Sequence, residues 1–399
     1  MKDKNIVLGV SGGISAYKAV EVLRLLVKGG VRARVAMTEH ATRFVTPLTF
    51  EALSGNKVIW DMWEAGTGPM DHITWGQEAD LIIIAPATAN FIGKVAAGLA
   101  DDFLTTLVIA ATAKVLVCPA MNSRMFENPA VQENMRRLRE RGYTVMPPAE
   151  GDLACGAEGL GRLPESDDIV DQAAFLLAEH DLAGLKMLVT AGATTEAIDP
   201  VRYVTNRSSG KMGYALARAA GLRGAEVVLV SGPTHLRPPR NVIFKRVNTA
   251  EEMRQAVFEH RGTCDVILKA AAVLDYKPRQ PSAHKIKKLE EIQTLELVRN
   301  PDILAELGCS KDERRCLLVG FAAETQDLLA NASEKLREKN LDMIVANDVS
   351  REDAGFEVDT NVVRLIYRDG HLEELPLMTK QEVADHVLDR IKRLWEATS

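Results

Sequence analysis

The residues of this chain that are best suited to chemistry lie in short loops behind apolar runs. The first loop is Gly9–Ser15, GVSGGIS, whose glycines do not follow the spaced G-x-G-x-x-G pattern of dinucleotide-binding turns. A helix that starts directly behind Gly12 and Gly13 presents unpaired N–H groups and a positive dipole end, which suits a phosphate. Ser15 adds a hydroxyl donor, and Thr38, at the end of the next expected strand, adds another. The same turn is also compatible with a purely structural role.

Further candidates occur in later loops of the first half. The segment MDHITW places His72 in a first helical turn, where the helix dipole disfavours its protonation; the alternative is an ordinary surface histidine. APATAN ends in Asn90, and PAMN contains Asn122, whose amide could hold a carboxylate, next to Met121, which is also typical of core filling. The glycine-rich segment GDLACGAEGLGRLPE has the length and composition of a mobile lid and contains Cys155.

A second and longer strand-to-helix turn follows Val189 and includes DPVRYVTNRSSGKMG. Asp199 and the proline behind it start a turn. Arg202 offers a fork-shaped donor that suits a phosphate or a carboxylate. Asn206 stands just before the SSG that leads into the next helix. Each of these residues alone has a structural explanation, but their combination indicates a ligand site.

Polar side chains also follow the later strands. KAAAVLD places Asp275 where it could bind magnesium or a ribose, and HKIKK concentrates Lys285 with two further lysines. Such a charge run is either a solvated face or a contact for polyphosphate. GFAAET places Phe321 where a base could stack. Lys335 and Lys339 lie four residues apart on one helical face, so both can reach the same anion.

These loops need a scaffold in which strand and helix alternate, and the alternation occurs twice. Short strands that are apolar throughout, separated by amphipathic helices, predict a doubly wound α/β sheet with ligands at the carboxyl ends of its strands. The pattern restarts after a polar hinge, so we expect two tandem α/β domains, residues 1–183 and 184–399. The expected strands are Asn5–Val10, Ala33–Met37, Leu81–Ala85, Val115–Cys118, Thr144–Met146, Met187–Ala191, Glu226–Val230, Asp265–Ala270, Cys316–Phe321, Asp342–Ala346 and Val362–Tyr367.

Composition narrows the classes of function. The 399 residues carry a formal net charge of −6, which leaves no basic face for nucleic acid. Five scattered cysteines without a C-x-x-C pair indicate reduced thiols in a cytoplasmic protein rather than a disulfide framework or a zinc site. The most apolar runs are too short and too interrupted to span a membrane, and we expect the N-terminal segment to be a strand, not a signal peptide.

With Gly9–Ser15, His72, APATAN, PAMN and the ACG of the lid in place, the first half resembles the flavin-containing cysteine decarboxylases. Its motifs are most similar to the phosphopantothenoylcysteine decarboxylase domain of the bifunctional enzymes of coenzyme A biosynthesis. The resemblance implies a flavodoxin-like fold with bound FMN, which oxidises the thiol carbon and so creates an electron sink for loss of carbon dioxide. The residues that it assigns to FMN are Gly12, Gly13, Ser15, Thr38 and Asn90. It assigns the base to His72, the carboxylate contact to Asn122 with Met121, and the proton donor to Cys155.

The second half resembles the phosphopantothenate–cysteine ligase domain of the same family through DPVRYVTNRSSGKMG, KIKK and GFAAET. Ala193 and Ala197 replace a glycine and a proline of that pattern. The resemblance implies a second Rossmann-like α/β domain, CTP as co-substrate, an acyl-CMP intermediate and Mg²⁺ at Asp275. The residues that it assigns to CTP are Lys269, Ala270, Ala271, Asp275, Lys285, Asn300, Pro301, Asp302, Ile303, Phe321, Lys335 and Lys339. It assigns the acyl-cytidylate to Asn206, with Arg202 nearby, and counts Lys285 among the catalytic groups.

The expected partners are therefore small molecules: 4′-phosphopantothenate, cysteine and CTP, with neither nucleic acid nor membrane. The resemblance also implies a homo-oligomer, a dodecamer of decarboxylase trimers and ligase dimers. Two other interpretations of the first half stay open, a prenyltransferase-like flavoprotein and a regulatory flavoprotein that binds partners. Asn122 and Cys155 argue against the first, because prenyl transfer needs neither group. The presence of His72 beside them argues against the second.

Overall fold

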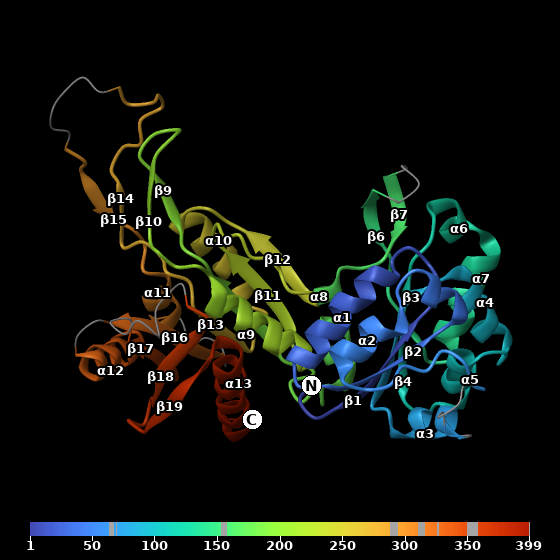
Figure 1. Ribbon diagram of the computed structural model, residues 1–399. Coiled ribbons are helices and arrows are strands. Elements are labelled where there is room, and N and C mark those ends of the chain that lie inside the picture. Colours follow the sequence, from blue (N-terminus) through green and yellow to red (C-terminus); the bar gives the residue numbers. More distant parts are fainter. Residues whose placement is uncertain are drawn as a thin grey trace. The chain divides into compact units, whose positions relative to one another are not determined.

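The computed structural model describes residues 1–63, 68, 70–152, 158–287, 294–309, 316–324, 327–348 and 358–398 (Figure 1). The chain separates into two compact units, Met1–Ala178 and Glu179–Ser399, called here the N-terminal and C-terminal units. The division falls slightly before the boundary expected after residue 183. No helix among these described residues is long and apolar enough to cross a membrane.

The N-terminal unit is built on a five-stranded, fully parallel sheet of order β2-β1-β3-β4-β5. This is the flavodoxin-like order, in which the winding direction changes between β1 and β3 and ligands bind at the carboxyl ends of the strands there. The strands are β1 (Asn5–Val10), β2 (Arg32–Met37), β3 (Leu81–Ala87), β4 (Lys114–Pro119) and β5 (Thr144–Val145). The helices are α1 (Ala16–Lys28), η1 (Glu39–Arg43), α2 (Pro47–Ser54), α3 (Asp71–Glu78), α4 (Ala89–Ala97), α5 (Phe103–Ala110), α6 (Ser123–Glu127), α7 (Pro129–Glu140) and α8 (Ser166–Leu177).

Both faces of this sheet are buried, which explains why its strands are apolar throughout. Successive strand residues point to opposite faces: Ile6 and Leu8 pack on the side of α1, α2 and α8, whereas Val7 packs on the side of α3, α4, α5 and α7. The helix α1 forms because its buried residues recur every three to four positions, from Ala16 to Leu26, along one stripe. These contacts fix where α1 begins, and therefore where the glycine loop lies.

A small antiparallel hairpin, β6 (Ala149–Asp152) with β7 (Glu158–Arg162), lies outside the main sheet. The segment between its strands, which contains Cys155, lies outside the described residues. The hairpin is not among the expected elements, since its polar, glycine-rich strands carry no apolar alternation.

The C-terminal unit contains an eight-stranded mixed sheet of order β12-β11-β8-β13-β16-β17-β18-β19. The strands are β8 (Lys186–Ala191), β11 (Glu226–Ser231), β12 (Val242–Arg246), β13 (Val266–Lys269), β16 (Leu317–Glu324), β17 (Met343–Asp348), β18 (Thr360–Tyr367) and β19 (Leu372–Thr379). Helices α9 (Lys211–Leu222) and α13 (Lys380–Thr398) pack on one face. Helices α10 (Ala250–Arg261), α11 (Ile303–Cys309) and α12 (Leu328–Glu338) pack on the other. The last two strands run antiparallel, unlike a simple repeat of the first unit.

Two further hairpins extend from the C-terminal unit beyond its sheet (Figure 1). They pair β9 (Thr195–Ala197) with β10 (Tyr203–Thr205), and β14 (Tyr276–Pro278) with β15 (Leu297–Arg299). We call these four strands the arm. They occupy the long loop behind β8 and the loop behind β13, so both loops continue into the arm and return to the carboxyl edge of the sheet.

Candidate functional site

The glycine loop of the N-terminal unit presents unpaired backbone donors. The N–H groups of Gly12, Gly13, Ile14 and Ser15 make no hydrogen bond within the described part of the chain. Ser11 anchors the loop instead, because its N–H and its hydroxyl donate to the carbonyl of Pro86 at 3.2 and 2.8 Å. The loop ends at the N-terminus of α1, so these four donors lie at the positive end of the helix dipole.

Close packing explains why position 12 is a glycine. A Cβ on Gly12 would lie 2.4 Å from the Cβ of His40, whereas one on Gly13 would reach the Thr88 methyl only at an ordinary 3.4 Å. Thr38 follows β2, and its backbone N–H donates to Val10 at 3.0 Å. The Thr38 hydroxyl is buried without a hydrogen-bond partner among the described residues. An orphaned hydroxyl beside unpaired N–H groups is what an absent ligand would leave.

Asn90 lies in the first turn of α4 and is exposed. Its helix is tied to the glycine loop, because the Thr88 N–H donates to the Ser11 hydroxyl at 2.9 Å. The carboxyl ends of β1, β2 and β3 therefore gather the glycine loop, Thr38 and Asn90 at one edge of the sheet. This edge lies at the topological switch point.

The PAMN loop lies at the end of β4, where the Ala120 N–H donates to Ala87 of β3 at 3.0 Å. The side chain of Asn122 caps α6, accepting from the Arg124 N–H at 2.9 Å. Its amide nitrogen is thus the end that could donate to a carboxylate. Met121 packs against the core, as the core-filling interpretation predicts for it.

Strand β7 lies against this loop, because the Met121 N–H donates to the Gly161 carbonyl at 2.8 Å. A Cβ on Gly161 would lie 2.2 Å from the Met121 carbonyl oxygen, and its φ of +139° also favours glycine. Cys155 lies outside the described residues, but the strand that follows it in sequence touches the PAMN loop.

His72 is the second residue of α3, and its imidazole makes no hydrogen bond to any described residue. Trp75, one turn further on, lines a different cavity with Asn5 and Arg32 at the amino ends of β1 and β2. Asp71 does not cap the helix; it is the first helical residue and accepts from the Gly68 N–H at 2.8 Å.

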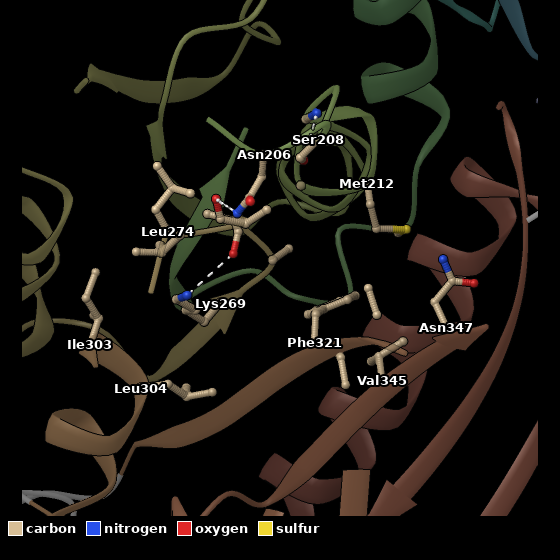
Figure 2. Close-up of a pocket in the computed structure, with 18 of the residues that line it drawn as sticks. Asn206, Ser208, Met212, Lys269, Leu274, Ile303, Leu304, Phe321, Val345 and Asn347 are labelled. Carbon is tan, nitrogen blue, oxygen red and sulfur yellow. Dashed lines mark hydrogen bonds between the residues drawn. The ribbon is translucent and has the colours of Figure 1, made fainter. Parts of the chain in front are cut away.

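The C-terminal unit contains a cavity of about 810 Å³ at the carboxyl edge of its sheet (Figure 2). Most of the residues expected to bind CTP line it: Lys269, Ala270, Ala271, Asp275, Asn300, Pro301, Asp302, Ile303, Phe321, Lys335 and Lys339. Asn206 also lines it, whereas Arg202 and Lys285 do not. In Figure 2, Phe321 lies between the Lys269 side of the cavity and the side with Met212 and Asn347.

The cavity carries an excess of positive charge on the Lys269 side. Burial of its ammonium, with the nearby charge of Lys335, lowers the pKa of Lys269 to about 8. Lys339 pairs with Asp302 at 2.6 Å, and this contact holds the pKa of the Asp302 carboxyl below its usual range despite its burial. Three lysines against Asp302 and the exposed Asp275 favour a multiply charged anion.

Buried threonines of the second turn hold the small residues of the cavity wall. The Thr190 hydroxyl accepts from the Ala271 N–H at 3.1 Å, and the Thr194 hydroxyl accepts from the Leu274 N–H at 3.0 Å. Asn206 donates to the Ala272 carbonyl at 3.2 Å (Figure 2). We did not predict the two threonines, although TAGATT at a strand end carries the polar signal.

Other lining residues also escaped prediction. Lys380, at the first position of α13, is only 6% exposed and donates to the Val358 carbonyl at 2.5 Å. Burial, with the charge of Lys211, lowers its pKa to about 8. The Asn347 amide donates to Asn361 at 3.4 Å. A lysine that starts an amphipathic helix gives no sequence signal that it lies in a cavity.

Few side chains of the cavity are suited to bind a metal ion. Within the described ranges, no three His, Cys, Asp or Glu side chains cluster closely enough to hold an ion. Mg²⁺ often needs only one or two protein carboxylates, because substrate phosphates and water supply its remaining ligands. Asp275 and Asp302 line the cavity and are of the right chemical type.

Comparisons with known proteins match both units. Residues 1–177 match the family described as Flavoprotein, and residues 182–394 match the family described as DNA/pantothenate metabolism flavoprotein C-terminal domain. A solved C-terminal domain of a coenzyme A biosynthesis bifunctional protein CoaBC shares 46% identity, with 55% of this chain and 100% of that chain covered and a TM-score of 0.48.

Full-length relatives cover both units together. The Coenzyme A biosynthesis bifunctional protein CoaBC of Bacillus subtilis is 49% identical over 403 residues, covering 100% of this chain and 99% of the relative. The protein of the same name from Mycobacterium tuberculosis is 45% identical, covering 97% of this chain and 96% of the relative. The chain therefore belongs to the CoaBC family, the bifunctional enzymes of coenzyme A biosynthesis that combine a flavoprotein decarboxylase domain with a ligase domain.

Proposed function

We propose that the C-terminal unit joins 4′-phosphopantothenate to cysteine with CTP, and that the N-terminal unit decarboxylates the product, 4′-phosphopantothenoylcysteine, to 4′-phosphopantetheine with FMN. The observation that carries the ligase half is the cavity in which Lys269, Lys335 and Lys339 meet Asn206. The decarboxylase half depends on the unpaired N–H groups of the glycine loop.

The cavity suits CTP by size and by charge. Its volume of about 810 Å³ lies toward the upper end of ordinary ligand pockets, which leaves room for a second substrate. The three lysines would offset the triphosphate charge, and Asp275 would hold Mg²⁺ or the ribose. The Asn300 side-chain oxygen is buried without a partner among the described residues, and it is an acceptor for an amino or hydroxyl group of the nucleotide.

The proposed ligation proceeds in two steps, activation of the carboxylate and formation of the amide. The substrate carboxylate attacks the α-phosphorus of CTP, the bond to the β-phosphate breaks, and pyrophosphate leaves. The cysteine amine then attacks the acyl carbon, CMP leaves, and the amine loses a proton. Asn206 would hold the acyl-cytidylate, and Asn206→Asp should form it but transfer it slowly to cysteine. A variant that releases no pyrophosphate from CTP would contradict this role.

The glycine loop fits the phosphate of FMN. Four unpaired N–H groups, the hydroxyl of Ser15 and the orphaned hydroxyl of Thr38 supply donors for it, and Asn90 flanks the same edge. When bound, FMN supplies a two-electron oxidation of the thiol-bearing carbon, which makes loss of carbon dioxide possible. Asn122 would donate to the substrate carboxylate and orient it. His72 would accept a proton, and Cys155 would return one to the product.

Assembly belongs to the same proposal. Large apolar side chains stand exposed near the glycine loop, among them Ile14 at 57% and Tyr17 at 61%. Val201, in the turn between β9 and β10, and Tyr203 of the arm are exposed to a similar degree. We propose that these exposed side chains contribute to the contacts of a homo-oligomer of trimeric decarboxylase and dimeric ligase units.

One incubation tests both halves. The purified chain, reconstituted with FMN, is mixed with 4′-phosphopantothenate, cysteine and CTP-Mg²⁺, and CMP, pyrophosphate and carbon dioxide are followed together. We expect equal amounts of all three. Carbon dioxide release without flavin would refute the N-terminal assignment, and product formation without CMP would refute the C-terminal one. Replacing CTP with ATP measures the nucleotide preference.

A further inference from the structure

The turn between β9 and β10 is hydrogen-bonded to the lysine-rich segment around Ile286. One oxygen of the Asp199 carboxylate, Oδ1, accepts from the N–H groups of Val201 and Arg202, both at 2.8 Å. The other, Oδ2, accepts from the Arg202 guanidinium at 2.6 and 3.0 Å. It also accepts from the Ile286 N–H at 3.1 Å. The carboxylate therefore organises its own turn and holds a second segment 87 residues away in sequence.

Arg202 forms a second hydrogen bond to the same residue, Ile286. Its Nη2 donates both to Asp199 and to the Ile286 carbonyl, the latter at 2.7 Å. The N–H and the C=O of Ile286 are thus both held, one by each member of a single ion pair. A nearby backbone bond from the Ser282 N–H to the Ile198 carbonyl, at 2.9 Å, supports the same contact.

The geometry indicates a permanent pair rather than a ligand site. The Asp199 side chain is fully buried, and burial alone would raise its pKa. The hydrogen bonds from Arg202 and the three backbone N–H groups outweigh burial and hold the pKa of this carboxyl well below its usual range. Nε and Nη2 of Arg202 are engaged in these contacts and its charge is balanced by Asp199, which favours a structural role over the substrate contact expected from the sequence.

The held residue stands between two exposed lysines. Ile286 is half-buried, whereas Lys285 and Lys287 on either side of it are exposed. Among the described residues, the Asp199–Arg202 pair makes the only hydrogen bonds that tie residues 285–287 to the rest of the chain. The pair therefore holds the backbone next to Lys285 and limits where the Lys285 side chain can reach.

We propose that Asp199 and Arg202 act as a clamp that positions Lys285 for the ligation, and that neither touches the substrates. The clamp rests on the proposed function in one respect, because it assumes that Lys285 contacts the nucleotide. Both members are positioning residues. A long lysine side chain on an unheld segment would lose orientation, and a misplaced charge loses much of its catalytic value.

Three variants separate a clamp from a substrate contact. Arg202→Gln removes the guanidinium, Arg202→Lys keeps the charge but loses the fork, and Asp199→Asn removes the partner of Arg202. For a clamp, we expect kcat for CMP release to fall about tenfold to a hundredfold in all three, as for lost charge-assisted hydrogen bonds, with the Kd for CTP little changed. Near-wild-type activity in Arg202→Lys, or higher activity in Asp199→Asn, would show that Arg202 binds an anion and would overturn the proposal.

A control and a second readout guard against simple misfolding. Arg279→Gln breaks an exposed ion pair with Glu296 on the other hairpin of the arm and should keep wild-type kcat. Carbon dioxide release from supplied 4′-phosphopantothenoylcysteine should stay normal in every variant. Trypsin should cut after Lys285 or Lys287 faster in Arg202→Gln than in Arg279→Gln, because only the first releases Ile286. Equal cutting rates would contradict the clamp without reference to activity.

A double substitution tests whether the clamp works through Lys285. In a Lys285→Ala background, Arg202→Gln should cost less than about threefold more, because the group that it positions is already gone. Losses that multiply would overturn the proposal. Full activity in Lys285→Ala alone would remove the catalytic purpose of the clamp and the nucleotide role of Lys285, whereas the trypsin result would still report the clamp itself. Failure of the wild-type chain to form CMP would instead refute the proposed ligase.

Discussion

The two strand-to-helix turns of this protein solve different problems with similar residue types. In the N-terminal unit, five residues join β1 to α1, and the backbone N–H groups of the last four, Gly12 to Ser15, have no partner among the described residues. In the C-terminal unit, the turn between β8 and α9 runs through β9 and β10, and side chains such as Asp199 satisfy its backbone. The short turn is suited to bind with its backbone, whereas the long turn places side chains elsewhere.

Glycine has a different task in each turn. Gly12 leaves room for a neighbouring segment, because a Cβ there would collide with His40. Gly192 and Gly210 in the long turn have φ values of +75° and +80°, and a Cβ added to Gly210 would lie 3.3 Å from the backbone of Gly192. There the absent side chains permit two backbone segments to cross. Glycine substitutions in the short turn should therefore affect flavin binding, whereas those in the long turn should affect ligation.

The largest effect should come from Gly12→Ala. The new Cβ would be forced to within 2.4 Å of the His40 Cβ, so the loop must shift and misdirect its N–H groups. We expect the Kd for FMN to rise about a hundredfold or more, as several charge-assisted hydrogen bonds are lost. Fluorescence titration of the apoprotein measures this.

Gly13→Ala is the matched control, because its Cβ would meet the Thr88 methyl at 3.4 Å. We expect its FMN affinity to stay within about threefold of the wild type, which corresponds to a cost below about 1 kcal/mol. CMP release should be normal in both variants. Equal affinities in Gly12→Ala and Gly13→Ala would show that the short turn does not bind the cofactor through its backbone.

The next largest effect concerns Lys269 and pH. Its pKa of about 8 in the free cavity means that it is charged at pH 7 and increasingly neutral above pH 8. An anionic ligand favours the charged form and raises this pKa, so by linkage CTP affinity should be constant below about pH 7 and fall as pH rises through 8. Isothermal titration at pH 7 and pH 9 measures the slope.

Lys269→Met should lower CTP affinity about tenfold to a hundredfold at pH 7 and abolish most of the pH dependence. Lys380→Met is its control, since Lys380 also has a pKa of about 8 and lines the same cavity. If Lys380→Met removes the pH dependence while Lys269→Met retains it, the triphosphate lies on the other side of Phe321.

Sequence patterns predicted the scaffold well because every central strand is apolar. The strand β1 has its expected bounds, Asn5–Val10. The arm was missed, since its strands of three residues are too short for periodicity. The strand expected at Val362–Tyr367 exists as part of β18, but alternation could not show that it runs antiparallel.

Some site residues could likewise be predicted from the sequence, and others could not. Asn206, in the turn between β8 and α9, and Phe321, expected at the end of a strand, could be predicted to line one cavity because the carboxyl ends of parallel strands share an edge. Arg202 was predicted to contact a ligand without regard to Asp199, its ion-pair partner in the structure, and its ligand role stays a prediction. The D-P-V-R spacing is itself typical of a turn in which an aspartate binds the backbone ahead of it, so Asp199 was a readable signal. His72 could not be placed by any local pattern.

A smaller effect should follow from Thr194→Val in the long turn. The valine keeps the shape but removes the acceptor for the Leu274 N–H, which is then left without its bond. Losing a buried partner costs about 1–3 kcal/mol, so the thermal transition of the C-terminal unit should move down by several degrees. Differential scanning calorimetry resolves it from the transition of the N-terminal unit. CTP affinity should fall about tenfold, while FMN affinity stays unchanged; a loss of both would mean that the two turns are not independent.

The smallest effect should come from Ser15→Ala, and it isolates binding from stability. Ser15 stands at the cap position of α1, yet its side chain makes no capping hydrogen bond. Its removal should therefore cost less than about 0.5 kcal/mol of stability, whereas Thr249→Ala, which breaks the capping box of α10, should cost about 1 kcal/mol. If the Ser15 hydroxyl donates to the phosphate, FMN affinity should still fall about threefold to tenfold. Paired thermal melts and FMN titrations of the two variants decide this. A Ser15→Ala protein that loses stability but no affinity would make the serine an ordinary helix cap, and the short turn would then bind through its backbone alone.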